Sequence, residues 1–204
     1  MGARLVAVSK YNPASAIQEA YEAGQRIFGE SHVQELVEKQ QVLPSDIEWH
    51  FIGHLQTNKV KYIAPFISLI HAVDSMKLLN EINRQGEKCG RIIPCLLQLH
   101  VAQEETKYGF TFEECREVLS GNEWKGLTHI SLHGLMCMAS NTDNQNQVRA
   151  EFKKVHQFFQ EMQQARGEEA PDFKQLSMGM SGDFEIAIEE GATMVRVGRS
   201  IFMG

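Results

Sequence analysis

A lysine stands at the end of the first apolar run of the chain, in RLVAVSKYNP (residues 4–13). The segment Leu5 to Val8 is typical of a buried strand, and Lys10 falls on the same face as Val6 and Val8, because side chains two apart in a strand share a face. An amine that points into a core can act as a nucleophile toward a carbonyl group. Strand ends also reach solvent, where a long lysine stem extends to water. This segment alone leaves both interpretations open.

Two segments near the end of the chain have the composition of an anion site. In SMGMSGD (residues 177–183), Ser177 and Ser181 offer hydroxyl groups, and the small residues let backbone N–H groups approach an anion. A second, shorter segment of this kind consists of Gly198, Arg199 and Ser200. Either segment alone is equally consistent with ordinary turn and cap residues. Together, at the ends of adjacent strands, they favour a phosphate site.

An inward lysine beside a phosphate site points to a cofactor that carries both an aldehyde and a phosphate. Pyridoxal 5'-phosphate (PLP), held as a lysine aldimine, has both features. The amine must be neutral to attack, and burial together with a cationic neighbour favours the neutral form. Arg196, in the last predicted strand, is the candidate neighbour. Alternatively, Arg196 pairs with a carboxylate such as Asp183 or Glu185.

Further polar side chains follow other predicted strands, in FGESHVQE (residues 28–35) and WHFIGHLQTNK (residues 49–59). His50 and His54 have the spacing of a metal pair only on a helix, and the glutamate of an H-E-x-x-H motif is missing, so we expect no metal site. Met136 lies near the same edge, where core packing is favoured over ligand contact. The residues of this group that we expect at the cofactor site are His50, Gly53, Asn58 and Met136.

Strands and helices alternate along the chain without a linker or a change in composition. The predicted strands are 4–10, 26–30, 48–53, 68–74, 92–101, 129–138, 175–179 and 193–198. Three predicted helix starts are Asn12 with Pro13, Ser31 with Gln34, and Thr111 with Glu114. Eight strands in this order favour one α/β domain over residues 1–204, a (β/α)8 TIM barrel with trimmed terminal helices. An open, doubly wound parallel sheet is the alternative.

The composition excludes several classes of protein. The net charge is −6, and Lys and Arg form no cluster, which argues against nucleic-acid and membrane partners. The chain shows neither a leader segment nor an apolar run of about 20 residues that could span a membrane. Its four cysteines form no C-x-x-C pair and are expected to be reduced. We therefore expect a cytoplasmic protein, and a monomer rather than a dimer.

Six ordered segments resemble one known family, the pyridoxal phosphate homeostasis proteins, which look like the barrel domain of bacterial alanine racemase standing alone. The segments are AVSK-x-x-P (7–13), FGE-x-x-VQE (28–35), WHFIG-x-LQ-x-NK (49–59), HGLM (133–136), LSMGMS-x-D (176–183) and MVRVG-x-x-IF (194–202). They cover nearly the whole chain in order, and together they are far more specific than any one of them alone.

The resemblance implies a role for each end of the chain. Lys10 would form the aldimine with PLP, and Arg196 would face the pyridine nitrogen. The residues implied to surround the phosphate are Ser177, Gly179, Met180 and Ser181 on one side, and Gly198 and Arg199 on the other. In the racemase, the second catalytic base is a tyrosine on a separate domain. The resemblance thus implies a carrier that supplies PLP to apoenzymes, without efficient turnover.

Two other functions fit the same residues. A PLP-dependent amino-acid racemase of low activity needs the same lysine and the same phosphate site. A Schiff-base aldolase that acts on a sugar phosphate also needs a barrel lysine and a phosphate site, but it would bind no PLP and would be colourless. The sequence leaves both alternatives open.

Overall fold

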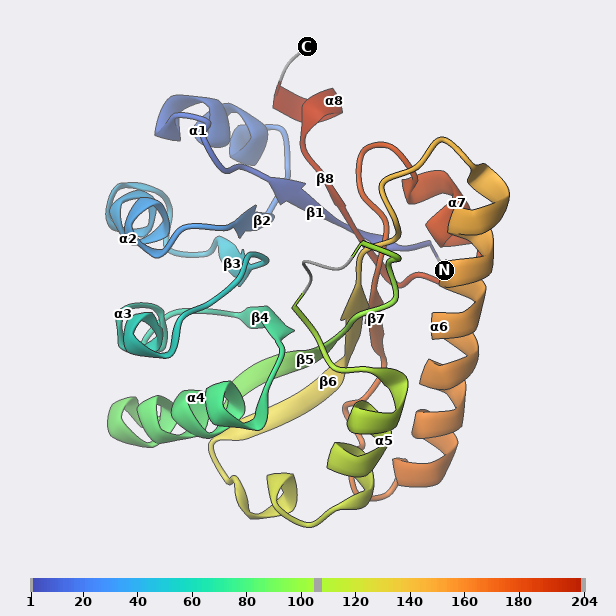
Figure 1. Cartoon of the computed structure of the whole chain (residues 1–204). Helices are drawn as coiled ribbons and strands as arrows, with labels where there is room; N and C mark the ends of the chain where they lie inside the picture. Colours follow the sequence, from blue (N-terminus) through green and yellow to red (C-terminus); the bar gives the residue numbers. More distant parts are fainter. Residues whose placement is uncertain (1, 105–107, 203–204) are drawn as a thin grey trace.

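The computed structural model describes residues 2–104 and 108–202, in which eight parallel strands form a closed barrel. The strands are β1 (Arg4–Val8), β2 (Ile27–Glu30), β3 (Glu48–Phe51), β4 (Leu69–Val73), β5 (Ile93–Leu99), β6 (Ile130–Cys137), β7 (Gln175–Ser177) and β8 (Met194–Val197). The helices are α1 (Ala14–Glu22), α2 (Val33–Val42), α3 (Val60–Ile63), α4 (Met76–Cys89), α5 (Phe112–Ser120), α6 (Gln145–Arg166), α7 (Phe184–Glu189) and α8 (Arg199–Phe202), with 3₁₀ turns η1 (Thr57–Lys59) and η2 (Trp124–Gly126). Figure 1 shows the helices arranged around the strands.

The first and last strands close the barrel. In this pairing Val6 of β1 lies opposite Arg196 of β8, and Ala7 lies opposite Val197. The (β/α)8 barrel expected from the alternation of elements is therefore confirmed over the open sheet. Closure makes the carboxyl ends of β1, β7 and β8 neighbours, although β1 is separated from the other two by most of the chain.

The strand side chains divide into two apolar layers. The barrel interior holds a small cluster formed by Val6, Ile27, Leu69, Ala72, Leu96, Met136 and Met194. A much larger cluster lies between the strands and the helices, with Phe28, Trp49, Phe51 and Phe152 among its buried members. This alternation is the period-2 pattern of a strand that is buried on both faces. The large outer layer supplies most of the apolar burial, so the narrow interior can hold polar side chains.

One of the three predicted helix starts is confirmed. Thr111 and Glu114 form a capping box at α5, in which the Thr111 hydroxyl accepts from the Glu114 N–H at 3.1 Å and the Glu114 carboxylate accepts from the Thr111 N–H at 2.8 Å. The other two are wrong. Helix α1 is preceded by Pro13 without a side-chain cap, because Asn12 instead donates to the carbonyl of Lys10 at 3.1 Å. Helix α2 begins at Val33 with His32 as its uncapped N-cap.

The last helix is short, as expected. Helix α8 covers only Arg199–Phe202, and a groove of about 610 Å³ lies between it and α1, with Leu5, Ala20, Ile201 and Phe202 among its lining residues. In the part of the chain that the structure describes, no helix is long and apolar enough to cross a membrane.

Candidate cofactor site

Lys10 lies at the carboxyl end of the barrel strands, but its surroundings differ from those expected. Strand β1 ends at Val8 instead of continuing to residue 10, and the Lys10 side chain is exposed. A turn causes this difference: the Asn12 N–H donates to the Ser9 carbonyl at 3.1 Å, and Tyr11 has a left-handed φ of 66°. The prediction of a buried lysine inside the core is therefore wrong. The amine is instead placed at the open mouth of the barrel, where the active sites of such barrels lie.

The segment after β7 is folded closely against its neighbours. A Cβ atom on Gly179 would lie 2.6 Å from the Ala187 Cβ, and Gly179 has φ of +105°, so only glycine fits this position without strain. The Gly179 carbonyl accepts from the Arg196 N–H at 2.9 Å, and the Met180 N–H donates to Asp183 at 2.8 Å. These contacts fix the loop against β8 and α7.

The segment after β8 meets this first loop. The Gly198 N–H donates to the Ser181 hydroxyl at 3.4 Å, and a Cβ on Gly198 would lie 2.8 Å from the Val8 carbonyl oxygen of β1. Within the described residues, several backbone N–H groups of the two loops have no hydrogen-bond acceptor, namely those of Ser181, Gly182, Arg199 and Ser200. Unpaired N–H groups from two adjoining loops are the donors that a phosphate requires.

Ser177 does not lie with these loop residues but below them, inside the barrel. Its hydroxyl accepts a short hydrogen bond from the Arg196 guanidinium and contacts the His71 Nδ1 atom at 2.9 Å. A second Arg196 nitrogen donates to the Cys137 carbonyl at 2.9 Å. In the described part of the chain, Arg196 forms no ion pair with a carboxylate, so the alternative pairing with Asp183 or Glu185 is not found. Ser177 therefore orients Arg196, and we no longer expect it to face the phosphate.

The hydrogen bonds continue across the interior to His50. The His71 Nε2 atom lies 2.9 Å from the His50 Nδ1 atom, so a buried chain runs from Arg196 through Ser177 and His71 to His50. Burial lowers the pKa of His50 to about 3, and burial also holds the pKa of His71 well below its ordinary value. Burial lowers the pKa of Arg196 to about 10, which leaves the guanidinium charged at neutral pH. The interior thus contains one cation and two neutral imidazoles.

The remaining predicted site residues are divided between the interior and the rim. His50 and Met136 are buried in the barrel, at 2% and 1% exposure. Gly53 and Asn58 lie in the turn after β3, where a Cβ on Gly53 would be 2.8 Å from the Ser31 Cβ. Among the described residues, no group of three or more His, Cys, Asp or Glu side chains is placed to hold a metal ion.

Two residues of this region are not identified by the sequence analysis. His71 lies in a segment that the sequence predicts as an apolar strand. A histidine in the middle of such a segment is a polar residue at a buried position, as Arg196 is in β8. Asp74 follows the same strand and lies 3.4 Å from the His54 Nδ1 atom, while the His54 ring stacks on Tyr108 at 3.8 Å between centroids. A polar residue inside an otherwise apolar strand was the signal available for His71.

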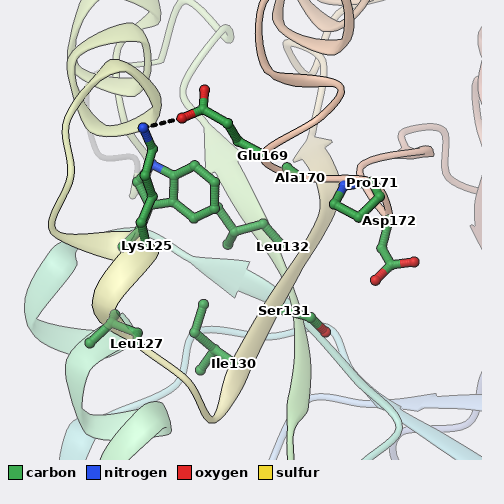
Figure 2. A pocket seen from close by; sticks show the side chains of 10 residues that line it. Lys125, Leu127, Ile130, Ser131, Leu132, Glu169, Ala170, Pro171 and Asp172 are labelled. Carbon is green, nitrogen blue, oxygen red and sulfur yellow. Dashed lines mark ion pairs between the residues drawn. The ribbon is translucent and has the colours of Figure 1, made fainter.

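A cavity at the opposite end of the barrel is not part of this site. It measures about 390 Å³ and lies beside the amino end of β6. Figure 2 shows Leu127, Ile130, Leu132 and Pro171 around it, with an ion pair between Lys125 and Glu169. The active sites of (β/α)8 barrels lie at the carboxyl ends of the strands, whereas this cavity lies at their amino ends.

Comparison with known proteins agrees with the fold. The sequence profile of the alanine racemase N-terminal domain matches residues 1–204. The "Pyridoxal phosphate homeostasis protein" of Aquifex aeolicus (strain VF5) is 40% identical over 201 residues, which cover 98% of this chain and 86% of that protein. The protein of the same name from Haemophilus influenzae is 39% identical over 202 residues, which cover 98% and 84%.

Solved structures give the same result. PipY of Synechococcus elongatus PCC7942, solved without PLP, superposes with a TM-score of 0.89 at 38% identity and covers 98% of this chain and 92% of its own. The PLP-bound form of PipY gives 0.86 at 37% identity with the same coverage. Alanine racemase from Bartonella henselae gives a TM-score of 0.70 at 16% identity, with 54% of its chain covered, which shows a shared fold alone.

A closed barrel with a lysine after its first strand and glycine loops after its last two defines the barrel class of the alanine racemase N-terminal domain. Within that class, the chain belongs to the family of pyridoxal phosphate homeostasis proteins.

Proposed function

We propose that this protein binds PLP at the mouth of the barrel, holds it reversibly through Lys10, and serves the supply and homeostasis of the cofactor in the cytoplasm. The observation that carries the proposal is the pairing of β1 with β8, which brings the Lys10 turn beside the loops after β7 and β8. A relative of 37% identity, PipY, was solved with PLP bound. The four cysteines are free thiols, which suits a reducing compartment.

The residues of the site fit the three parts of PLP. The loop N–H groups around Ser181 and Arg199 suit the phosphate, and the close packing at Gly179 and Gly198 keeps the backbone near it. The buried Arg196 suits the pyridine nitrogen as a hydrogen-bond donor. The Lys10 side chain is exposed at the mouth, where the aldehyde carbon of PLP could reach it. An incoming amine or an acceptor enzyme could reach PLP at the same place.

PLP supplies an aldehyde that condenses reversibly with an unprotonated primary amine, with loss of one water molecule. Lys10, at the mouth of the barrel, would provide that amine. Arg196 holds its own proton at neutral pH, so it donates to the ring nitrogen without protonating it. An unprotonated ring is a weak electron sink, which disfavours chemistry at the α-carbon of a bound amino acid.

Ser177 and Ser181 should have different effects on PLP binding. We expect Ser181→Ala to weaken PLP binding about tenfold, because a hydrogen bond to a charged group contributes about 1.5–3 kcal/mol. It should also reduce competition by inorganic phosphate. Ser177→Ala should leave competition by phosphate unchanged, because this hydroxyl binds Arg196 and His71 instead. Titrations of each variant with PLP, with and without phosphate, test this, and a loss of phosphate competition in Ser177→Ala would contradict it.

The carrier function is distinguished from racemase activity by exchange at the α-carbon. We expect one PLP to bind per chain, and the loaded protein to exchange no α-proton of L- or D-alanine in deuterated water beyond the rate of free PLP. Proton NMR of the amino acid measures the exchange, and chiral chromatography measures racemisation. Rapid exchange that disappears in Lys10→Ala would support the racemase alternative, and a protein that binds no PLP would reject the proposal altogether.

A further inference from the structure

A cluster of three charged side chains, two of them buried, lies behind the Lys10 turn. It consists of Glu30 at the end of β2 and of Glu35 and Lys39 on α2, and we call it the Glu30–Glu35–Lys39 cluster. The Lys39 ammonium lies 2.9 Å from a Glu30 carboxylate oxygen and 2.7 Å from a Glu35 oxygen. Glu30 is fully buried, and Lys39 is 6% exposed. Both glutamates belong to the FGESHVQE segment, for which the cofactor site described above gives no role.

The hydrogen bonds of this cluster end on the backbone at both sides of Lys10. Before Lys10, the Lys39 ammonium donates to the Ser9 carbonyl at 2.9 Å, and the Ser9 hydroxyl makes a short hydrogen bond to Glu30. After Lys10, the Tyr11 N–H donates to a Glu35 oxygen at 2.7 Å. The same Glu35 oxygen accepts from Lys39. One connected set of charges therefore holds the backbone at residues 9 and 11, on either side of Lys10.

Burial of these charges costs free energy of folding, so packing alone does not account for the cluster. Buried charges lose hydration, and an apolar contact of similar volume between β2 and α2 would be at least as stabilising. Burial raises the pKa of Glu30, although hydrogen bonds from Ser9 and Lys39 oppose the rise, and the other Glu30 oxygen has no partner among the described residues. The turn it holds includes Tyr11 in a left-handed conformation that non-glycine residues rarely adopt.

We propose that Glu30, Glu35 and Lys39 are positioning residues, which fix the backbone on both sides of Lys10 so that its amine is directed at the aldehyde carbon of PLP. This inference rests on the proposed function. The cluster contacts residues 9 and 11, and among the described residues its side chains make no hydrogen bond to the loops after β7 and β8. Its loss should therefore affect attachment to Lys10 and spare recognition of the phosphate and the ring.

Two probes separate these effects. PLP can attach to Lys10, whereas pyridoxine 5'-phosphate lacks the aldehyde and reports only on the ring and the phosphate. We expect Lys39→Met and Glu35→Ala each to lower the fraction of PLP fixed to Lys10 by borohydride at least about tenfold, because misplacement of a reacting group by about 1 Å can reduce its reactivity a hundredfold. The dissociation constant for pyridoxine 5'-phosphate should stay within about twofold of the wild-type value.

Two further variants serve as matched controls. Glu35→Gln retains a side-chain oxygen that can accept from the Tyr11 N–H, so it should fix more PLP than Glu35→Ala. Glu38→Ala alters an exposed carboxylate on the same helix, which among the described residues accepts a hydrogen bond only from Gln34, at 3.4 Å, and it should behave as the wild type does. Glu35 is 23% exposed at its side chain, so Glu35→Ala tests the proposal even where Lys39→Met does not fold.

The outcomes are distinct. Equal losses for both probes would show a general structural role for the cluster and overturn the proposal, as would variants that fix PLP at the wild-type level. A selective loss for PLP, partly restored in Glu35→Gln, would support it. If the wild-type protein itself fixes no PLP on Lys10, the proposed function fails and not merely the role of the cluster.

Discussion

Lys10→Ala should eliminate the borohydride-fixed pyridoxyl group from the protein while leaving measurable binding of PLP. Hydride reduces the carbon–nitrogen double bond to a stable amine, so the label marks the lysine that held the cofactor. The loops after β7 and β8 and the Arg196 chain do not depend on Lys10. We expect the variant to bind PLP at least about tenfold more weakly than the wild type, a change of about 1.4 kcal/mol or more.

Peptide mapping and absorbance titration measure the two parts of this prediction. Lys59→Ala is the matched control, because Lys59 is an exposed lysine of the turn after β3, and it should retain one label per chain on Lys10. A label on Lys59 or Lys61 of the wild type would contradict the assignment of Lys10. Complete loss of PLP binding in Lys10→Ala would contradict the independence of the phosphate loops.

The unfolding free energy should fall steeply below pH 6.5, because the barrel interior holds two neutral histidines. The pKa of His50 is lowered to about 3 and that of His71 is also well below its ordinary value, in both cases chiefly by burial. The unfolded chain therefore binds more protons than the folded chain between about pH 6.5 and the folded pKa values, and stability is lost as the pH falls. From pH 7 to pH 5 we expect a loss of about 2 kcal/mol from His50 and a further loss of the same sign from His71.

Urea denaturation of the ligand-free protein at pH 7 and pH 5 measures this loss. Burial raises the pKa of Glu30, which acts in the opposite direction, so the difference between the wild type and a variant is the informative quantity. In His71→Asn, the part of the pH dependence that His71 contributes should disappear, whatever the stability of the variant at pH 7. His54→Asn, at an exposed position of the rim, is the control. An unchanged pH dependence in His71→Asn would show that this histidine is not held neutral.

The buried chain also explains why a cation can lie inside the barrel with no ion-paired carboxylate among the described residues. Arg196 is 4% exposed and donates to Ser177 and to the Cys137 carbonyl. Neutral oxygen acceptors satisfy part of the guanidinium while leaving its charge uncancelled. A ligand with a basic ring nitrogen is then a suitable partner, which is the role proposed for PLP.

The sequence by itself determined the order of the elements and the positions of the loops that could bind phosphate. Alternating apolar segments and capping signals depend on residues within a few positions of one another, so they are legible in one stretch of chain. For this reason the eight strands were found, as were the capping box at Thr111 and the segments around Gly179 and Gly198. The six family segments added the expectation of PLP, which composition alone could not supply.

Only the tertiary structure decided which side chains meet. His71 and Ser177 lie 106 residues apart along the chain, and Lys39 reaches a carbonyl 30 residues before it. Strand periodicity predicts the face on which a residue falls, but not the register that brings distant strands level or the residue at which a strand ends. The end of β1 at Val8 therefore moved Lys10 from the expected core to the exposed mouth. Closure of the barrel then placed the Lys10 turn next to the end of β8, because a closed sheet makes its first and last strands neighbours.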